Sequence, residues 1–219
     1  MTTWSHSALK DFEQCARKYA EVRIFKRVKR EETEQSIYGT ELHTAAEAYG
    51  KTKVADPKFS YIYPIMDALL AKPGHMYFEH EMALDEALAP CDWKSPKAWV
   101  RGIADFMKVD NAKRRARCVD LKTGSDKYAD TDQLDLMALL IFAHFPAVLE
   151  VKGALIFVLK GRMVKHNVRY EDKDALWWRY RERVAKIDAA KENGVWNPTQ
   201  SGLCKKHCAV VSCPFNGRH

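Results

Sequence analysis

Two aspartates and a lysine are spaced in a way that suits the hydrolysis of a phosphodiester. Asp105 lies in one strand-like apolar run, and Asp120 and Lys122 lie in the next, after a turn signal at Asp110-Asn111. If the two runs pair as a hairpin, Asp105 and Asp120 come near one another across it. Lys122 points to the same face as Asp120, because side chains along a strand repeat every two residues.

Two neighbouring carboxylates repel each other, so either a cation compensates for them or one of them is protonated. Mg²⁺ is the simplest such cation, since it prefers oxygen ligands and usually keeps waters for a phosphate substrate. A metal at Asp105 and Asp120 would orient and acidify a water, and Lys122 would position or deprotonate the nucleophile. The alternative is an ordinary amphipathic hairpin with Asp and Lys on its wet face.

The hydrophobic pattern predicts the elements that must position these side chains. Helices are expected over 5–19, 39–49, 62–70, 131–144 and 174–192, and strands over 76–84, 98–109, 117–122, 151–159 and 164–170. Ser5 or Ser7 would cap the first helix. In the first strand, Glu79 and Glu81 are expected to point to the same side, because they lie two residues apart. This order predicts an α/β or α+β fold with a mixed central sheet flanked by helices.

The length of 219 residues and a hydrophobic content of 47% favour one folded domain over 1–219. Within it, 1–36 hold the first helix and a basic segment, 37–170 hold the core, and 171–219 hold the last helix and a cysteine-rich tail. No apolar run approaches the length of a membrane helix, and the N-terminus has no signal-peptide core. We therefore expect a cytoplasmic protein without a membrane partner.

The net charge of +7 is concentrated in two clusters. The clusters are Lys26, Arg27, Lys29 and Arg30, and Lys113, Arg114, Arg115 and Arg117. Such clusters attract phosphate backbones, so nucleic acid is a leading candidate partner, with Lys113 to Arg117 tracking the backbone. Solvated faces and loops are the alternative reading of these runs.

Three cysteines lie close together near the C-terminus. Cys204, Cys208 and Cys213 are spaced C-x3-C-x4-C. Disulfides are not expected, because the cytosol keeps thiols reduced. The spacing is too sparse for a metal knuckle of two close pairs, so a fourth ligand must come from elsewhere.

The motifs, taken in order, resemble those of the PD-(D/E)XK nuclease superfamily, and within it the RecB-like exonuclease branch, which includes CRISPR-associated RecB-like nucleases and many phage proteins. The matching features are a loose Ser5-x-Ser7 start followed by Phe12, Cys15 and Tyr19; Gly39-x3-His43-x3-Glu47; Gly102-x2-Asp105; Asp120-Leu121-Lys122-Thr123-Gly124; Gln133; and the terminal cysteines. The resemblance spans nearly the whole chain.

This resemblance implies a restriction-endonuclease-like core and a Mg²⁺- or Mn²⁺-dependent DNA exonuclease of recombination, repair or phage DNA metabolism, in a bacterial or phage-infected cell. It implies that Lys122 is catalytic and that the metal ligands are His43, Asp105, Asp120 and the backbone carbonyl of Leu121. Glu47 would hold a second metal or order its waters, or else be a surface glutamate. Glu81 could orient His43 or approach the metal, or be a partly exposed strand residue.

Gln133 falls in the family's Q-x3-Y motif, which helps to position DNA and the lysine. This chain departs from the motif, since Met137 stands where tyrosine is expected. The resemblance also implies a [4Fe–4S] cluster, held by Cys15, Cys204, Cys208 and Cys213, that clasps the chain ends. The relatives more often show C-x2-C-x5-C, and here His207 occupies the place of the middle cysteine. Zn²⁺, bound by the same thiolates or by His207 with three of them, and free buried cysteines are the alternatives.

Other functions remain open on this sequence. A non-cleaving module that binds nucleic acid or a partner would share the fold, as would a restriction-type endonuclease or an RNA nuclease. No G-x4-G-K-[ST] motif occurs, so any strand separation would come from a helicase, annealing or single-strand-binding partner, or the substrate would be single-stranded.

Overall fold

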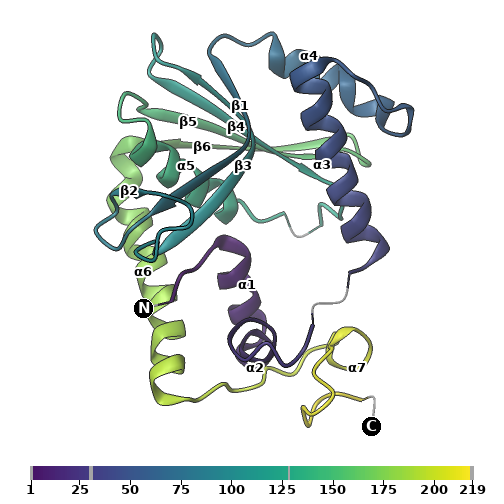
Figure 1. Cartoon of the computed structure of the whole chain (residues 1–219), viewed down its shortest axis with the longest axis vertical. Coiled ribbons are helices and arrows are strands. Elements are labelled where there is room, and N and C mark those ends of the chain that lie inside the picture. Colours follow the sequence, from purple (N-terminus) through teal and green to yellow (C-terminus); the bar gives the residue numbers. More distant parts are fainter. Residues whose placement is uncertain (1, 30–31, 128, 218–219) are drawn as a thin grey trace. The chain divides into compact units, whose positions relative to one another are not determined.

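The computed structural model describes residues 2–29, 32–127 and 129–217 (Figure 1). The chain divides into two compact units, Thr33–Trp177 and the combination of Met1–Glu32 with Trp178–His219. The first of these, the sheet unit, contains the central sheet. The second, the terminal unit, is formed by the two ends of the chain.

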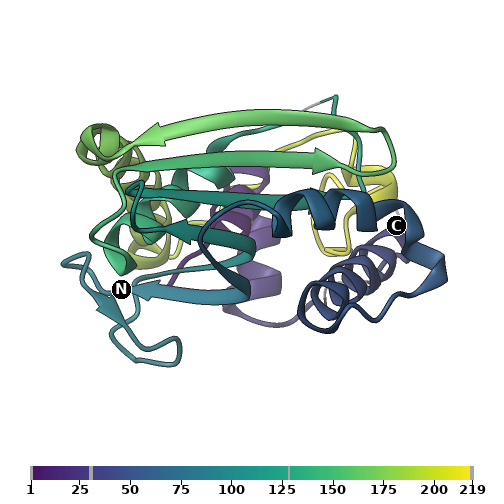
Figure 2. The same ribbon diagram turned by 90° about the horizontal axis from the view of Figure 1, so that it is seen from above.

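The sheet unit is built on one mixed sheet (Figure 2), as the order of elements predicts. Its strand order is β2-β1-β3-β4-β5-β6, and the pair β4–β5 is parallel while the other pairs are antiparallel. The strands are β1 His75–Leu84, β2 Pro90–Cys91, β3 Val100–Asp110, β4 Arg115–Lys122, β5 Glu150–Phe157 and β6 Arg162–Arg169. The short strand β2 carries no periodic signal, and the sequence did not predict it.

Helices cover both faces of the sheet in this unit (Figure 1). They are α3 Glu34–Thr52, the 3₁₀ helix η2 Pro57–Ile62, α4 Tyr63–Leu70 and α5 Asp132–His144. One apolar cluster joins α3, η2 and α4 to the sheet through Leu42, Phe59, Met66, Leu121 and Ile156. On the opposite face, Leu134 of α5 packs against Leu155 and Phe157. Neighbouring residues of β5 enter opposite clusters because strand side chains alternate.

Helix α3 begins at Glu34, earlier than the expected start at Gly39. A capping box explains the difference: Ser36 N donates to Thr33 Oγ1 at 3.1 Å, and Thr33 N donates to Ser36 Oγ at 2.9 Å. These bonds satisfy backbone donors that have no partner in the first turn of a helix. The cap adds a turn before the part of α3 that carries His43.

The terminal unit contains α1 His6–Gln14, α2 Ala16–Tyr19, the π-helical turn η1 Ala20–Ile24 and α7 Cys204–His207, while α6 Lys173–Asn193 starts in the sheet unit and ends here. Ser5 caps α1, as one of the two predicted caps. The single helix expected through Tyr19 is broken at Cys15, whose backbone is extended at φ −167° and ψ 108°. There the Cys15 thiol caps α2 by accepting from Lys18 N, so the break gives the sulfur a structural role.

Three aromatic rings of the terminal unit cluster around Trp196, and of these only Tyr19 is buried. The ring of Trp196 lies 6.3 Å from Phe12 and from Phe25 and 6.0 Å from Tyr19, between ring centroids. Trp4 is buried and stacks on Tyr180. Across the described parts of the chain, no helix is long and apolar enough to cross a membrane.

Candidate active site

The sheet opens at the two aspartates that the sequence singles out. The pairing of β3 with β4 ends at Phe106 and Val119, one residue short of Asp105 and Asp120. Continuing the same register would place these two aspartates directly opposite each other, as the hairpin predicts. Beyond this point β4 stays paired with β5, and β3 stays paired with β1. Asp105 and Asp120 therefore stand where two halves of the sheet separate.

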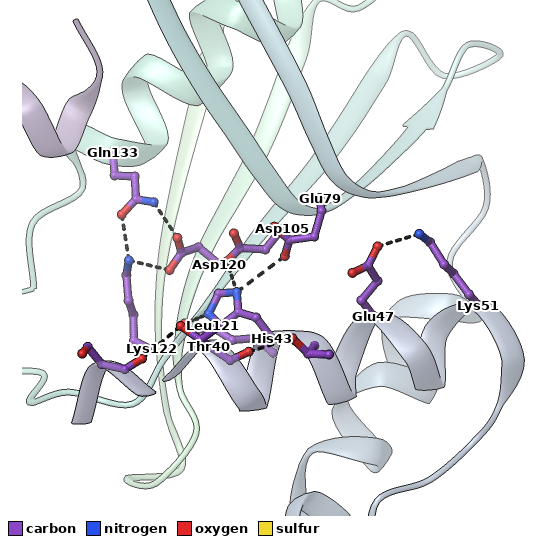
Figure 3. A network of polar contacts seen from close by, with 12 residues as sticks. Thr40, His43, Glu47, Lys51, Glu79, Asp105, Asp120, Leu121, Lys122 and Gln133 are labelled. Atoms are coloured by element: carbon purple, nitrogen blue, oxygen red, sulfur yellow. Dashed lines mark hydrogen bonds and ion pairs between the residues drawn. The ribbon is translucent and has the colours of Figure 1, made fainter. Parts of the chain in front are cut away.

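The strand pairing is also interrupted on the other side of Asp105. In the β1–β3 ladder, Phe78 pairs with Phe106 and His80 pairs with Ala104, but Glu79 has no partner in between. Glu79 has φ +44°, a left-handed conformation that costs a non-glycine residue about 1–3 kcal/mol. This conformation turns Glu79 toward Asp105 and His43, as Figure 3 shows. Backbone strain is thus stored at a cluster of polar groups.

His43 reaches this opening from α3 (Figure 3). Its Nε2 lies 3.0 Å from the carbonyl oxygen of Leu121, while its Nδ1 lies 3.3 Å from Asp105 Oδ2 and 3.7 Å from Glu79 Oε1. Both ring nitrogens therefore face acceptors, which is the arrangement of a doubly protonated imidazolium.

The charges at this site perturb one another strongly. Burial and the neighbouring Asp120 carboxylate raise the pKa of Asp105 to about 8. Burial by itself would lower the pKa of His43, but Glu79, Asp105, the Leu121 carbonyl and Asp120 outweigh it and raise the pKa of His43 to about 9. Both shifts favour the protonated forms, so Asp105 and His43 would each give up a proton on binding a metal.

Gln133 links the lysine and the second aspartate from the first turn of α5 (Figure 3). Gln133 Nε2 donates to Asp120 Oδ1 at 2.5 Å, and Lys122 Nζ donates to Gln133 Oε1 at 2.8 Å. Lys122 Nζ also lies 2.7 Å from Asp120 Oδ2. One amide thus fixes the positions of both charged groups. Gly102 lies close to α5, since a Cβ there would lie 2.5 Å from Leu140 Cδ1 and require that side chain to move.

The donor atoms at the opening fit a divalent metal. Glu79 Oε1, Asp105 Oδ2 and Asp120 Oδ2 are buried, and each lies near a cationic side chain, His43 or Lys122, which a metal could replace. One ligand atom from each of His43, Glu79 and Asp105 lies within 4.8 Å of the others. Carboxylates, a carbonyl and one imidazole are ligands that Mg²⁺ and Mn²⁺ accept. His43, Asp105, Asp120 and Leu121, all proposed from the sequence, come together here with Lys122 and Gln133.

Two glutamates differ from the sequence-based expectation. The structure does not bring Glu47 into this group, because its carboxylate pairs with Lys51 Nζ at 2.5 Å and lies apart from Asp105 (Figure 3). The sequence suggested that Glu81 orients His43 or approaches the metal, but Glu81 is exposed. Glu79, two residues earlier in β1, is the glutamate that lies beside His43. The alternating pattern of β1 placed both glutamates on the same side of the strand. Only the left-handed backbone at Glu79 shows which of them faces the site.

The basic residues proposed to track nucleic acid lie at the far end of the β3–β4 hairpin. Arg115 begins β4 and Lys122 ends it, which separates them by about 23 Å at a strand rise of about 3.3 Å per residue. Arg115 Nε pairs with Glu150 at 2.6 Å, and Arg114 Nε donates to the Ala147 carbonyl at 3.3 Å. Lys113 is exposed. Of the other basic cluster, Arg30 lies outside the described residues.

In the terminal unit, two of the four candidate cluster cysteines contact the same residue. Thr199 N donates to Cys15 Sγ at 3.5 Å, and Cys204 Sγ lies 3.7 Å from the Thr199 carbonyl oxygen. Cys213 is buried and Cys208 is partly buried. Within the part of the chain that the structure describes, the four thiols do not form a group compact enough for one ion.

A shallow hollow opens beside the two aspartates. Its lining includes Asp105, Asp120 and Gln133 together with apolar Ile103 and Met137. Met137 is the residue that replaces the tyrosine of the Q-x3-Y motif. The hollow therefore presents a thioether, rather than a phenol, next to the carboxylates.

Comparisons with known proteins agree with this architecture. No curated protein is detectably similar to the chain in sequence. A crystal structure from Eubacterium rectale, of a protein with a provisional exonuclease designation, matches with a TM-score of 0.52 and 14% identity over 92% of this chain and 85% of that one. The crystal structure of SSO0001 matches with a TM-score of 0.51 and 15% identity over 99% of this chain and 88% of that one. At these identities the likeness shows the fold alone.

The family comparison is more specific. The sequence profile of the PD-(D/E)XK nuclease superfamily matches residues 3–72 and 60–214, which together take in the site and most of the chain. This chain belongs to the PD-(D/E)XK nuclease superfamily.

Proposed function

We propose that this protein is a Mg²⁺- or Mn²⁺-dependent DNA exonuclease of the RecB-like branch, acting in recombination, repair or phage DNA metabolism. The observation that carries the proposal is the meeting of His43, Asp105 and Asp120 at an opening in the sheet, beside a lysine held by Gln133. The exonuclease designation of the Eubacterium rectale protein supports attack from DNA ends.

The side chains divide the work between holding the metal and moving protons. His43, Glu79, Asp105, Asp120 and the Leu121 carbonyl would hold the ion, which supplies positive charge to the phosphate and acidifies a water. His43 must lose one proton to become a ligand, so it gives up the Nδ1 or Nε2 proton that it holds in the metal-free site.

Lys122 is placed to assist the attack. In the metal-free site its ammonium lies between Asp120 and Gln133. If Asp120 bound a metal, Gln133 would still accept from Lys122 Nζ, so the ammonium would stay oriented with a donor free for the phosphate. A fixed donor aimed at developing negative charge needs little reorganisation during the reaction.

End-labelled DNA tests this function. Single- and double-stranded DNA, linear and circular, would be incubated with Mg²⁺, Mn²⁺ or EDTA, using wild type, Asp120→Asn and the exposed control Asp92→Asn. We expect loss of linear DNA only, with metal, in wild type and the control. Cutting of circular DNA would indicate an endonuclease. No cleavage by folded, metal-loaded wild type would favour the non-cleaving binding module.

We also propose that Cys15, Cys204, Cys208 and Cys213 hold a [4Fe–4S] cluster. In support, backbone amides donate to two of the sulfurs: Lys18 N and Thr199 N to Cys15, and Ser201 N to Cys204. Such hydrogen bonds stabilise thiolates, and cubane ligands lie farther apart than the ligands of one ion. Iron content and visible absorption after anaerobic purification test the proposal, and stoichiometric zinc in place of iron would overturn it.

A further inference from the structure

The turn between β5 and β6 exposes two large apolar side chains. Leu159 is 53% exposed and Met163 is 51% exposed, and we call this pair the apolar tip. Between them Gly161 has φ +60°, and a Cβ added there would meet no described atom within 4 Å. The turn lies at the right-hand end of the two green strands in Figure 2.

The apolar tip lies next to the proposed catalytic lysine. In the parallel pairing of β4 with β5, Lys122 lies opposite Phe157, and Val158 N donates to the Lys122 carbonyl at 3.1 Å. Leu159 follows two residues after Phe157, inside the turn, so its Cα lies at most about 7 Å from that of Phe157. A nucleic acid whose phosphate lies at Lys122 therefore has its next bases within reach of Leu159.

The charges around the apolar tip suit the same ligand. Lys160 and Arg162 flank Gly161, and Lys165 follows on β6. Arg162 also pairs with Asp126 in the loop that follows Lys122, which ties the turn to the catalytic strand. Cations beside exposed apolar groups match a DNA end, where phosphates border the flat face of the last base pair.

The chemistry of the side chains distinguishes two ways of contacting bases. Single strands are usually bound by stacking on aromatic rings, and the apolar tip has none. Leucine and methionine are instead among the residues that act as wedges between stacked base pairs. Leu159 and Met163 do not take part in the apolar clusters of the sheet unit. Those clusters contain the neighbouring residues Phe157 and Val158.

We propose that the apolar tip is a wedge against the terminal base pair of duplex DNA, which frees one strand to reach Lys122. This proposal rests on the proposed nuclease function. It assigns Leu159 and Met163 to duplex ends and not to single strands.

The test compares a blunt duplex with one of its strands alone as substrates. The variant is Leu159→Ser/Met163→Ser, and the matched control is Val54→Ser, which is 66% exposed just after the far end of α3. We expect the ratio of duplex to single-strand kcat/KM to fall about tenfold in the double variant and to stay within twofold in the control. A tenfold change corresponds to about 1.4 kcal/mol, within the range of one base contact. An unchanged ratio would overturn the proposal.

A second measurement separates failure of the wedge from failure of the nuclease assignment. A duplex with 2-aminopurine in its terminal base pair would be titrated with Asp120→Asn protein in Mg²⁺, with and without the Leu159→Ser/Met163→Ser changes. We expect fluorescence to rise only when the apolar tip is intact, because unstacking relieves quenching. Equal fluorescence with both proteins would overturn the wedge even if wild type cleaves DNA. A rise limited to the intact tip would support it even if wild type cleaves nothing.

Discussion

The chain offers two candidate metal sites, and they are organised in different ways. At the opening of the sheet, His43, Asp105, Asp120 and Lys122 are already in contact, and two cationic side chains offset the carboxylates. In the terminal unit, Cys15 and Cys204 meet at Thr199, while the described structure shows no contact that draws all four thiols together.

The difference follows from the elements that carry the ligands. The first site is built on strands and on two helices whose apolar faces fix their positions, so packing sets its geometry. The second depends on the short helix α7 and on loops with little apolar surface. For such a segment, metal-binding free energy becomes folding free energy. We therefore expect changes at the first site to affect chemistry and changes at the second to affect stability.

The largest expected effect is on turnover. Lys122→Ala should lower kcat by about a thousandfold or more, equivalent to about 4 kcal/mol, because it removes the oriented ammonium next to the phosphate. The melting temperature should change little, since this side chain is partly exposed at the mouth of the site. Single-turnover cleavage and calorimetry measure the two quantities, with exposed Lys97→Ala as the control. Turnover within tenfold of wild type would remove Lys122 from the mechanism.

The second largest effect is on stability, at the cysteines of the terminal unit. Cys204→Ser should destabilise the terminal unit by about 3 kcal/mol and lower its Tm by roughly 10 °C or more, if the cluster clasps the chain ends. Visible iron–sulfur absorption should disappear with it. Cys91→Ser, in β2 of the sheet unit, is the matched control and should preserve both signals. If Cys204→Ser had the same Tm and the same visible absorption as wild type, the cysteines would not stabilise the terminal unit through a cluster.

The sequence predicted the first site well because its ligands lie on strongly patterned elements. The turn signal after Asp110 joins two alternating strands, and the turn over 111–114 pairs Asp110 with Arg115. Extending this register brings Asp105 opposite Asp120. The ends of α5 and β4 were also predicted within about two residues, since proline, glycine and polar residues mark them.

The features that the sequence missed depend on backbone conformation. Nothing in the pattern of β1 says that Glu79 has a positive φ, so Glu79 and Glu81 could not be told apart. The break at Cys15 has the same origin, because residues on both sides of it favour one continuous helix. A Thr33–Ser36 capping box was present in the sequence but lies in a run without apolar period.

A smaller effect on turnover is expected at Gln133, which positions Lys122 and Asp120. Gln133→Met keeps the side-chain length and removes both hydrogen bonds, so kcat should fall about 10- to 100-fold, the usual range for a residue that orients others at a metal site. KM should change little, because Gln133 acts by orienting Lys122 and not by holding substrate. Exposed Gln35→Met is the control. A rise in KM with normal kcat would mean that Gln133 binds substrate instead.

The electrostatic strain at the first site predicts a stabilising substitution. The pKa of Asp105 is raised from 3.8 to about 8, so the folded metal-free protein retains a proton that the unfolded chain releases between these values. Wild-type stability therefore falls as pH rises through this window. Asp105→Asn removes the penalty, and we expect it to be more stable by about 1–2 kcal/mol at pH 8, with little gain near pH 4. Urea unfolding in EDTA measures this, and a gain that is independent of pH would contradict the assigned cause.

The smallest effect concerns a third region, the basic turn between β3 and β4. Lys113 is exposed and lies far from Lys122 along the hairpin, so Lys113→Ala should leave Tm and saturated turnover unchanged. DNA affinity should fall about two- to threefold, and the slope of log affinity against log salt should decrease by about 1, because one phosphate contact is lost. Fluorescence anisotropy over a salt series measures both, with exposed Lys94→Ala as control. An unchanged slope would show that nucleic acid does not run along this hairpin, and that the basic turn is a solvated surface.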